Sequence, residues 1–191
     1  MATSVLVMGS SHVNRLRHYT GINNTPALHN FDLRGGRIYN KSHCQQWEHH
    51  ISNVIPSHII VHLGGNDLEN EELSEEFAKE TVLKIISYCG MLKQRHSIQQ
   101  VTIMQLLPRT LTRHISQNIY NNMVVHANRF FKKEFKTILN IKYWNIKGVK
   151  NSPLNLYLDG VHFIQEGHIR YYRSVLGAII QAITYPAYIL I

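Results

Sequence analysis

Short apolar runs alternate with longer segments of helical spacing along the whole chain, and this alternation restricts the folds that the chain can adopt. Five of the runs have the length and the β-branched content of strands, and several are apolar on both faces. Strands of that kind are typical of a parallel sheet covered on both sides by helices. The runs are Ser4–Met8, Leu28–Leu33, His58–His62, Val101–Leu106 and Ile138–Trp144. The sequence therefore predicts an α/β fold, a three-layer α/β/α sandwich with a five-stranded parallel sheet.

The segments between these runs have the periodicity of amphipathic helices. One helix is predicted from about Glu71 to Lys93, with acidic residues in its first turns and basic residues later, the order that the helix dipole favours. A weaker helix is predicted over Asn40–Ser52. Two more are marked by apolar residues at helical spacing, one from Ile119 to Phe131 with a basic end, and one that begins near Gln165.

The length of 191 residues fits one domain, and we expect residues 1–191 to form it, with the role of the apolar tail 185–191 left open. The sequence contains no run of 18 or more apolar residues, so we expect no transmembrane helix. The N-terminal residues lack the basic leader of a signal peptide. Cys44 and Cys89 are then expected to be free thiols in a reducing compartment. These features predict a cytoplasmic protein.

The basic charge of the chain indicates a class of partner. Twenty Lys and Arg residues against twelve Asp and Glu residues give a formal net charge of +8. Such an excess favours nucleic acid or an anionic membrane surface. A basic cluster with interleaved aromatics has helical spacing, so its aromatics are better explained as core and its lysines as a solvated face. Its members are Phe130, Phe131, Lys132, Lys133, Phe135 and Lys136.

Residues able to do chemistry follow the predicted strands, where parallel sheets bind their ligands. A serine at a strand-to-helix turn exposes its hydroxyl and a backbone N–H at a helix N-terminus. Glycines let a backbone N–H approach a ligand. An Asp three residues before a His can hold the Nδ1 proton and leave Nε2 as a base. The blocks are GSSH (9–12), RGGR (34–37), LGGND (63–67) and LDGVH (158–162).

Together and in this order, the four blocks resemble those of the SGNH hydrolases, also called the GDSL esterase/lipase superfamily. The matching residues are Ser11, Gly36, Asn66 and His162, and the third member of the family's catalytic triad corresponds to Asp159. The resemblance spans about residues 4–183 and implies a flavodoxin-like sandwich with a serine hydrolase site.

The first block departs from the family pattern, which reads Gly-Asp-Ser where this chain reads Gly-Ser-Ser. The substituted position is not the nucleophile, so the departure affects hydrogen bonding at the turn and makes Ser10 a rival to Ser11. The spacing from Gly9 favours Ser11. An α/β-hydrolase fits poorly, because its nucleophile elbow G-x-S-x-G requires a glycine where Val13 stands.

The mechanism that the resemblance implies is acyl transfer without a metal or an organic cofactor. Ser11 attacks an ester carbonyl, His162 accepts its proton, and Asp159 orients the imidazole. The oxyanion would be bound by the N–H groups of Ser11 and Gly36 and by the side-chain amide of Asn66. The predicted function is a serine esterase for short-chain acyl or acetyl esters of lipids or carbohydrates.

A finer resemblance concerns two segments, VLVMGSSHVNRL (5–16) and LDGVHFIQEGHIRYYRSVLGAI (158–179). They look like the esterase-type domains that some animal retrotransposon proteins carry. This resemblance would make the chain one module of a larger polyprotein.

Other assignments follow from single segments. The loop Leu107–His114 follows the fourth strand, and its Arg109 and Arg113 are expected to bind an anionic part of the substrate. A second group, His43, Cys44, His49 and His50, has no zinc-site spacing and fits a solvated helix face. The alternative to an esterase is a weak or inactive SGNH-fold module that binds nucleic acid or an anionic membrane. The oligomeric state is left open, with self-association through the tail as one possibility.

Overall fold

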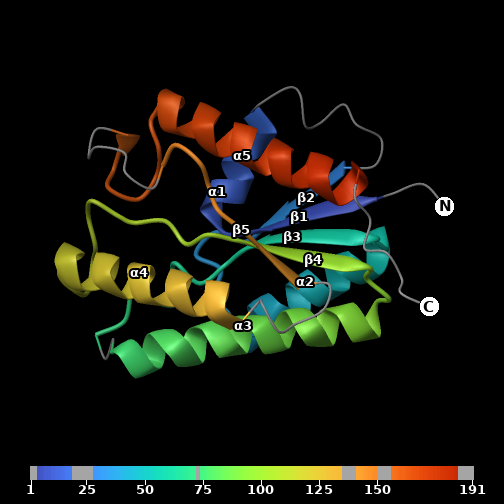
Figure 1. Ribbon diagram of the computed structural model, residues 1–191, viewed down its shortest axis with the longest axis horizontal. Helices are drawn as coiled ribbons and strands as arrows, with labels where there is room; N and C mark the ends of the chain where they lie inside the picture. Colours follow the sequence, from blue (N-terminus) through green and yellow to red (C-terminus); the bar gives the residue numbers. More distant parts are fainter. Residues whose placement is uncertain (1–3, 19–27, 72–73, 135–140, 150–155, 185–191) are drawn as a thin grey trace.

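The fold is a parallel sheet between two layers of helices (Figure 1). The computed structural model describes residues 4–18, 28–71, 74–134, 141–149 and 156–184. All five strands pair in parallel, in the order β2-β1-β3-β4-β5. Their bounds are Val5–Gly9 (β1), Leu28–Asp32 (β2), His58–His62 (β3), Gln100–Met104 (β4) and Ile141–Trp144 (β5). The predicted α/β sandwich with five parallel strands is therefore confirmed.

The helices divide between the two faces of the sheet. Figure 1 shows α5 and α1 on one side and α2, α3 and α4 on the other. The two hydrophobic clusters of the core follow the same division. The helical segments are Ser11–Asn14 (α1), the 3₁₀ helix Arg15–His18 (η1), Lys41–Val54 (α2), Glu75–Arg95 (α3), Gln117–Glu134 (α4) and Gln165–Thr184 (α5).

The three central strands, β1, β3 and β4, bury both of their faces, as their sequences predicted. Successive side chains of β1 point to opposite faces, so Leu6 and Met8 join the cluster under α2–α4, while Val5 and Val7 join the cluster under α5. Because a strand covered on both faces has little polar surface to place, apolar residues occupy nearly every position of β1.

Some element ends differ from the predictions because local hydrogen bonds decide them. Helix α3 begins at Glu75, four residues later than predicted, because the Ser74 side chain caps it by accepting from the Phe77 N–H. Strand β4 ends at Met104, and the N–H of Leu106 instead donates to the Asn128 side chain on α4. The predicted strand residues 138–140 lie outside the described residues.

At the C-terminal end of α4, the aromatic residues lie in the core and the lysines face solvent, as predicted. Phe131 is fully buried and Phe130 packs against the core, while Lys132 and Lys133 are exposed. Phe135, Lys136 and the tail 185–191 lie outside the described residues. Both Cys44 and Cys89 are free thiols. Within the described ranges, the helices are too short or too polar to cross a membrane.

The order of the strands indicates which edge of the sheet is suited to ligand binding. The chain passes from β1 to β2 on one side and then returns to β3 on the other side of β1. In open α/β sheets, ligands bind beyond the carboxyl ends of the strands at such a reversal. The residues that follow β1, β2 and β3 converge there.

Candidate active site

Ser11 begins α1 directly after β1, at this edge of the sheet. Its Oγ lies 2.9 Å from Nε2 of His162, a residue 151 positions later in the chain. The preceding residue, Ser10, has an extended backbone and caps α1 through its carbonyl oxygen, which accepts from the Val13 N–H at 2.9 Å. The structure therefore brings Ser11, and not Ser10, to the histidine.

Asp159 holds both the ring and the backbone of His162. Its Oδ2 lies 2.6 Å from His162 Nδ1, and its Oδ1 accepts from the N–H groups of Val161 and His162 at 3.0 and 2.7 Å. Burial opposes ionisation of Asp159, but these hydrogen bonds from His162 and Val161 outweigh it and lower the pKa of the carboxyl well below its usual range. An ionised Asp159 fixes the Nδ1 proton and leaves Nε2 to accept a proton from Ser11.

Gly160 fastens the Asp159–His162 turn to the loop after β4. Its carbonyl oxygen accepts from the N–H groups of Thr110 and Leu111 at 2.8 and 3.3 Å. The glycine has φ of +80°, and a Cβ on it would lie 2.1 Å from the Leu111 Cβ. Only glycine fits this contact, so the turn carries two catalytic candidates in a position set by a neighbouring loop.

Of the two glycines after β2, Gly36 is not placed to have the role that the sequence predicted for it. Gly36 was predicted to bind the oxyanion through its N–H, but this N–H donates to the Leu33 carbonyl oxygen at 2.9 Å. A Cβ on Gly36 would also lie 2.9 Å from the Leu33 oxygen and from the Trp47 ring. Gly36 therefore closes a turn against the core, and it is Gly35, with φ of +67°, that borders the cleft beside Ser11.

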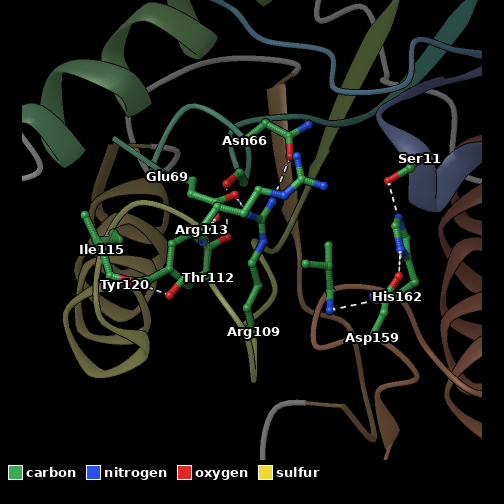
Figure 2. A network of polar contacts seen from close by, with 12 residues as sticks. Ser11, Asn66, Glu69, Arg109, Thr112, Arg113, Ile115, Tyr120, Asp159 and His162 are labelled. Carbon is green, nitrogen blue, oxygen red and sulfur yellow. Dashed lines mark hydrogen bonds and ion pairs between the residues drawn. The ribbon is translucent and has the colours of Figure 1, made fainter. Parts of the chain in front are cut away.

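The Asn66 side chain is held at both ends. Its Nδ2 donates to the Gly36 carbonyl oxygen at 3.2 Å, and its Oδ1 accepts from Arg109 Nη2 at 2.7 Å. In Figure 2 the amide nitrogen points away from Arg109, toward the side of the site where Ser11 lies. The amide has a second N–H to offer, so Asn66 fits the predicted role of an oxyanion donor.

Arg109 is not the free substrate-binding residue that the sequence predicted. It is only 6% exposed, and its Nη1 forms an ion pair with Glu69 (Figure 2). Its backbone N–H and carbonyl are both bound by the Asn121 side chain at 2.8 Å, and its guanidinium lies over the Tyr120 ring. The guanidinium of Arg109 is therefore bound by groups of the protein and is not available to a substrate.

Arg113 differs from Arg109 because its side chain is exposed and borders the cleft. Only its backbone is bound, since its N–H donates to the second carboxylate oxygen of Glu69. Glu69 thus joins Asn66, Arg109 and the Arg113 backbone in one network. Sequence reasoning missed Glu69, Tyr120 and Asn121, and no motif marks them.

Two buried histidines lie behind Ser11 and were also missed. The His12 ring lies 5.6 Å from the His62 ring and 5.8 Å from the His162 ring, and His62 Nδ1 lies 2.7 Å from the Tyr171 hydroxyl. Burial lowers the pKa of His62 to about 4, and burial with the neighbouring His62 and His162 lowers that of His12 well below its ordinary value. Both rings are therefore neutral at pH 7, which leaves the wall behind the nucleophile uncharged.

Ser11 borders two hollows of very different size. The smaller has a volume of about 20 Å³, close to that of one water molecule or methyl group, and is lined in part by His12, Leu107 and Tyr120. The larger is an open cleft of about 720 Å³ that also contains Asn66 and His162. The nucleophile candidate thus stands between a methyl-sized pocket and a wide cleft.

A model of the GDSL-like lipase/acylhydrolase family matches residues 8–174. The chain belongs to this family. Its members are acylhydrolases, so this GDSL acylhydrolase is a hydrolase that acts on esters. Comparison with curated proteins finds no match.

Solved structures share the fold of this GDSL acylhydrolase. A GDSL-like lipase from Bacteroides thetaiotaomicron has a TM-score of 0.72 at 19% identity, over 94% of this chain and 89% of the other. A carbohydrate esterase family 3 structure from Talaromyces cellulolyticus has a TM-score of 0.66 at 13% identity, over 95% and 98%. An acetyl xylan esterase has a TM-score of 0.61 at 13% identity, over 93% and 100%.

The histidines and cysteine of α2 make separate contacts. His43 Nδ1 accepts from the Arg37 N–H, Cys44 donates to the Ile38 carbonyl oxygen, and His50 stacks on Phe31. Among the residues that the structure describes, no group of three or more His, Cys, Asp or Glu side chains is arranged to hold a metal ion.

Proposed function

We propose that this GDSL acylhydrolase is a serine esterase that hydrolyses short-chain acyl esters, acetyl esters above all, through an acyl-enzyme on Ser11. The observation that supports this proposal is the continuous hydrogen-bonded chain from Ser11 Oγ through the His162 ring to Asp159. A nucleophile, a base and an acidic group that orients the base are the parts that acyl transfer needs.

In the first half-reaction, Ser11 Oγ attacks the ester carbonyl and passes its proton to His162 Nε2. The tetrahedral intermediate then breaks its bond to the alcohol oxygen, which takes the proton from His162. In the second half-reaction, water attacks the acyl-Ser11 ester and gives a proton to His162. The tetrahedral intermediate then breaks its bond to Ser11 Oγ, which takes the proton back from His162, and the acid is released. Asp159 stabilises the imidazolium in both steps and keeps its own charge.

The oxyanion requires donors that are already in place before the reaction. The N–H of Ser11 stands at the first position of α1, where helix geometry supplies no internal acceptor. The Asn66 amide supplies the second donor. We assign the third to the N–H of Gly35, which borders the cleft, because the N–H of Gly36 is bound to Leu33.

The preference for a short acyl group rests on the smaller hollow beside Ser11. Its 20 Å³ is close to the size of the methyl of an acetyl group, and we assign the acyl group to this hollow, which Leu107 and Tyr120 help to line. We therefore expect kcat/KM to fall along the series of p-nitrophenyl acetate, butyrate and octanoate.

The test is hydrolysis of p-nitrophenyl acetate by the wild type and by Ser11→Ala, Ser10→Ala and His162→Ala. We expect the Ser11 and His162 changes to lower kcat by about 10³-fold or more, and Ser10→Ala to leave it nearly unchanged. A fluorophosphonate label should attach to Ser11, as peptide mass spectrometry would show. Equal rates in all four proteins and no labelling would contradict the proposal and favour a module that binds nucleic acid or anionic membrane.

A further inference from the structure

The wide cleft beside Ser11 has a pronounced positive charge. Its lining includes arginines from three separate segments: η1, the turn after β2 and the loop after β4. These are Arg15, Arg34, Arg37 and Arg113, besides Arg109, which is paired with Glu69. Arg34 and Arg113 are exposed, and Arg15 and Arg37 are half-buried. Arginines outnumber acidic residues among the described residues of this lining, since only Glu69 and Asp159 are acidic.

The carboxylates of the cleft are already bound elsewhere. Asp159 accepts with both oxygens from the His162 ring and from two backbone N–H groups. Glu69 accepts with both oxygens from Arg109 and from the Arg113 N–H. The charge of Glu69 is balanced by Arg109, and both oxygens of Asp159 already accept hydrogen bonds.

The exposed guanidinium groups of the cleft are available to bind a ligand. Among the described residues, neither the Arg34 nor the Arg113 guanidinium has a hydrogen bond or an acidic partner, and Arg15 contacts the His168 ring rather than a carboxylate. Guanidinium groups bind carboxylate and phosphate in bidentate geometry. Arg34 and Arg113 are therefore cations without an acidic partner among the described residues, within the same hollow as Ser11, whereas the charge of Arg37 acts on the Asp67 carboxyl.

We propose that the natural substrate is a short-chain acyl ester whose alcohol part carries a negative charge, a carboxylate or a phosphate. This inference rests on the proposed esterase function and names its substrate class. The anion belongs to the alcohol because the acyl side of Ser11 has only a methyl-sized hollow, whereas the cationic cleft has 720 Å³. The arginines bind the alcohol part and direct its ester carbonyl to Ser11.

The experiment compares two matched pairs of acetyl esters. One pair is 1-acetylglycerol 3-phosphate and 1-acetylglycerol, and the other is 4-acetoxybenzoate and its methyl ester. Each kcat/KM is divided by the rate constant of hydroxide hydrolysis of the same ester. We expect the anionic member to be favoured by roughly tenfold, with a preference that declines as ionic strength rises. A preference confined to one pair identifies the anion as phosphate or as carboxylate.

The variants Arg34→Gln and Arg113→Gln test the cause of the preference. Each should lower the ratio of kcat/KM for the anionic ester to kcat/KM for the neutral ester by roughly twofold to fivefold. The control is Arg95→Gln, which removes the same charge from the end of α3, where Arg95 pairs with Glu48 on the surface. It should change neither ester.

The outcomes separate this inference from the esterase proposal. Ser11-dependent hydrolysis with equal rates for both members of each pair would overturn the anionic substrate and leave the esterase standing. If no ester is hydrolysed, the esterase proposal fails, and calorimetric binding to Ser11→Ala decides the inference. Binding of 1-acetylglycerol 3-phosphate in preference to 1-acetylglycerol, weakened by the Arg113 change, would support it, and equal binding would overturn it.

Discussion

Arg109 donates from Nη2 to Asn66 Oδ1 at 2.7 Å and in this way determines which end of the Asn66 amide faces the reaction (Figure 2). In the mechanism that we propose, an amide rotated by 180° would present its oxygen, an acceptor, to the oxyanion. The hydrogen bond from a guanidinium also draws electron density toward Oδ1 and strengthens the Nδ2 hydrogens as donors. Glu69 keeps Arg109 in place, so Arg109 and Glu69 are positioning residues for Asn66.

The first prediction concerns this arrangement. Arg109→Gln should lower kcat for p-nitrophenyl acetate by roughly tenfold to 10²-fold and leave KM nearly unchanged. This loss is no larger than the roughly 10²–10³-fold loss that follows removal of one oxyanion donor. The reason is that the Asn66 oxygen loses its partner, and the amide is then held only by the hydrogen bond from Nδ2 to the Gly36 carbonyl oxygen. Glu69→Gln, which retains an acceptor for Arg109, should have a smaller effect in the same direction.

A double-mutant cycle separates positioning from a general loss of structure. In an Asn66→Ala background, Arg109→Gln should cost little further activity, because the group that it positions is gone. The rates are measured well below the unfolding temperature of each variant, since loss of a buried ion-pair partner destabilises the fold. Additive losses in the cycle would contradict the role assigned to Arg109.

The second prediction concerns the contact between Gly160 and Leu111. Gly160→Ala should destabilise the protein by roughly 1–3 kcal/mol beyond the strain of a left-handed alanine, because the new methyl overlaps Leu111. It should also lower kcat by roughly 10²-fold, because the Asp159–His162 turn must move. Thermal unfolding and p-nitrophenyl acetate hydrolysis measure the two effects.

Gly148→Ala is the matched control for this change. Gly148 also has a positive φ, +76°, but a Cβ there would meet only the Arg170 side chain at 3.6 Å. It should show the backbone strain of roughly 1–2 kcal/mol and no loss of kcat. If the two variants behave alike, steric overlap with Leu111 does not hold the turn.

The third prediction concerns pH and the buried His62. Its pKa of about 4 lies below the ordinary value of 6.5, so between these two values the unfolded chain holds more protons than the folded chain. The free energy of unfolding must then fall as pH falls through this window, by roughly 2 kcal/mol at pH 5 from this residue alone. Burial raises the pKa of Asp67 to about 6, which gives a smaller opposing slope.

Comparison of variants isolates the contribution of His62. His62→Gln retains an amide that can bond the Tyr171 hydroxyl but does not titrate, so its loss of stability between pH 7 and pH 5 should be smaller by roughly 2 kcal/mol. The control is His49→Gln on the exposed side of α2. Urea unfolding at the two pH values is the measurement, and an unchanged difference in His62→Gln would refute the assignment.

Much of the fold was predictable because its signals are local. A strand buried on both faces must be apolar at successive positions, and β1 and β3 show this directly. Three of the four blocks follow β1, β2 and β3, and the fourth stands shortly before α5. Helix and strand ends were less accurate, since a single contact such as the Ser74 cap decides them.

The two site predictions that need correction depended on where a group points. The residue type and spacing of Gly36 suit an oxyanion donor, yet its N–H is taken by Leu33 in a turn. The charge of Arg109 suits an anionic substrate, yet Glu69, 40 residues earlier, pairs with it. The sequence around a donor or an acceptor does not show that a group distant in the chain already binds it.

The sequence by itself thus determined the layer architecture, the family blocks and the residue types of Ser11, Asn66, Asp159 and His162, because periodicity and strand-end position are properties of short segments. The tertiary structure brings Ser11, which the spacing from Gly9 already favoured over Ser10, to His162. It alone decided that Arg109 contacts Asn66 and that five arginines from three segments line one cleft. These relationships join residues tens to more than a hundred positions apart. Such distances are fixed only when the parallel strands bring their carboxyl ends to one edge of the sheet.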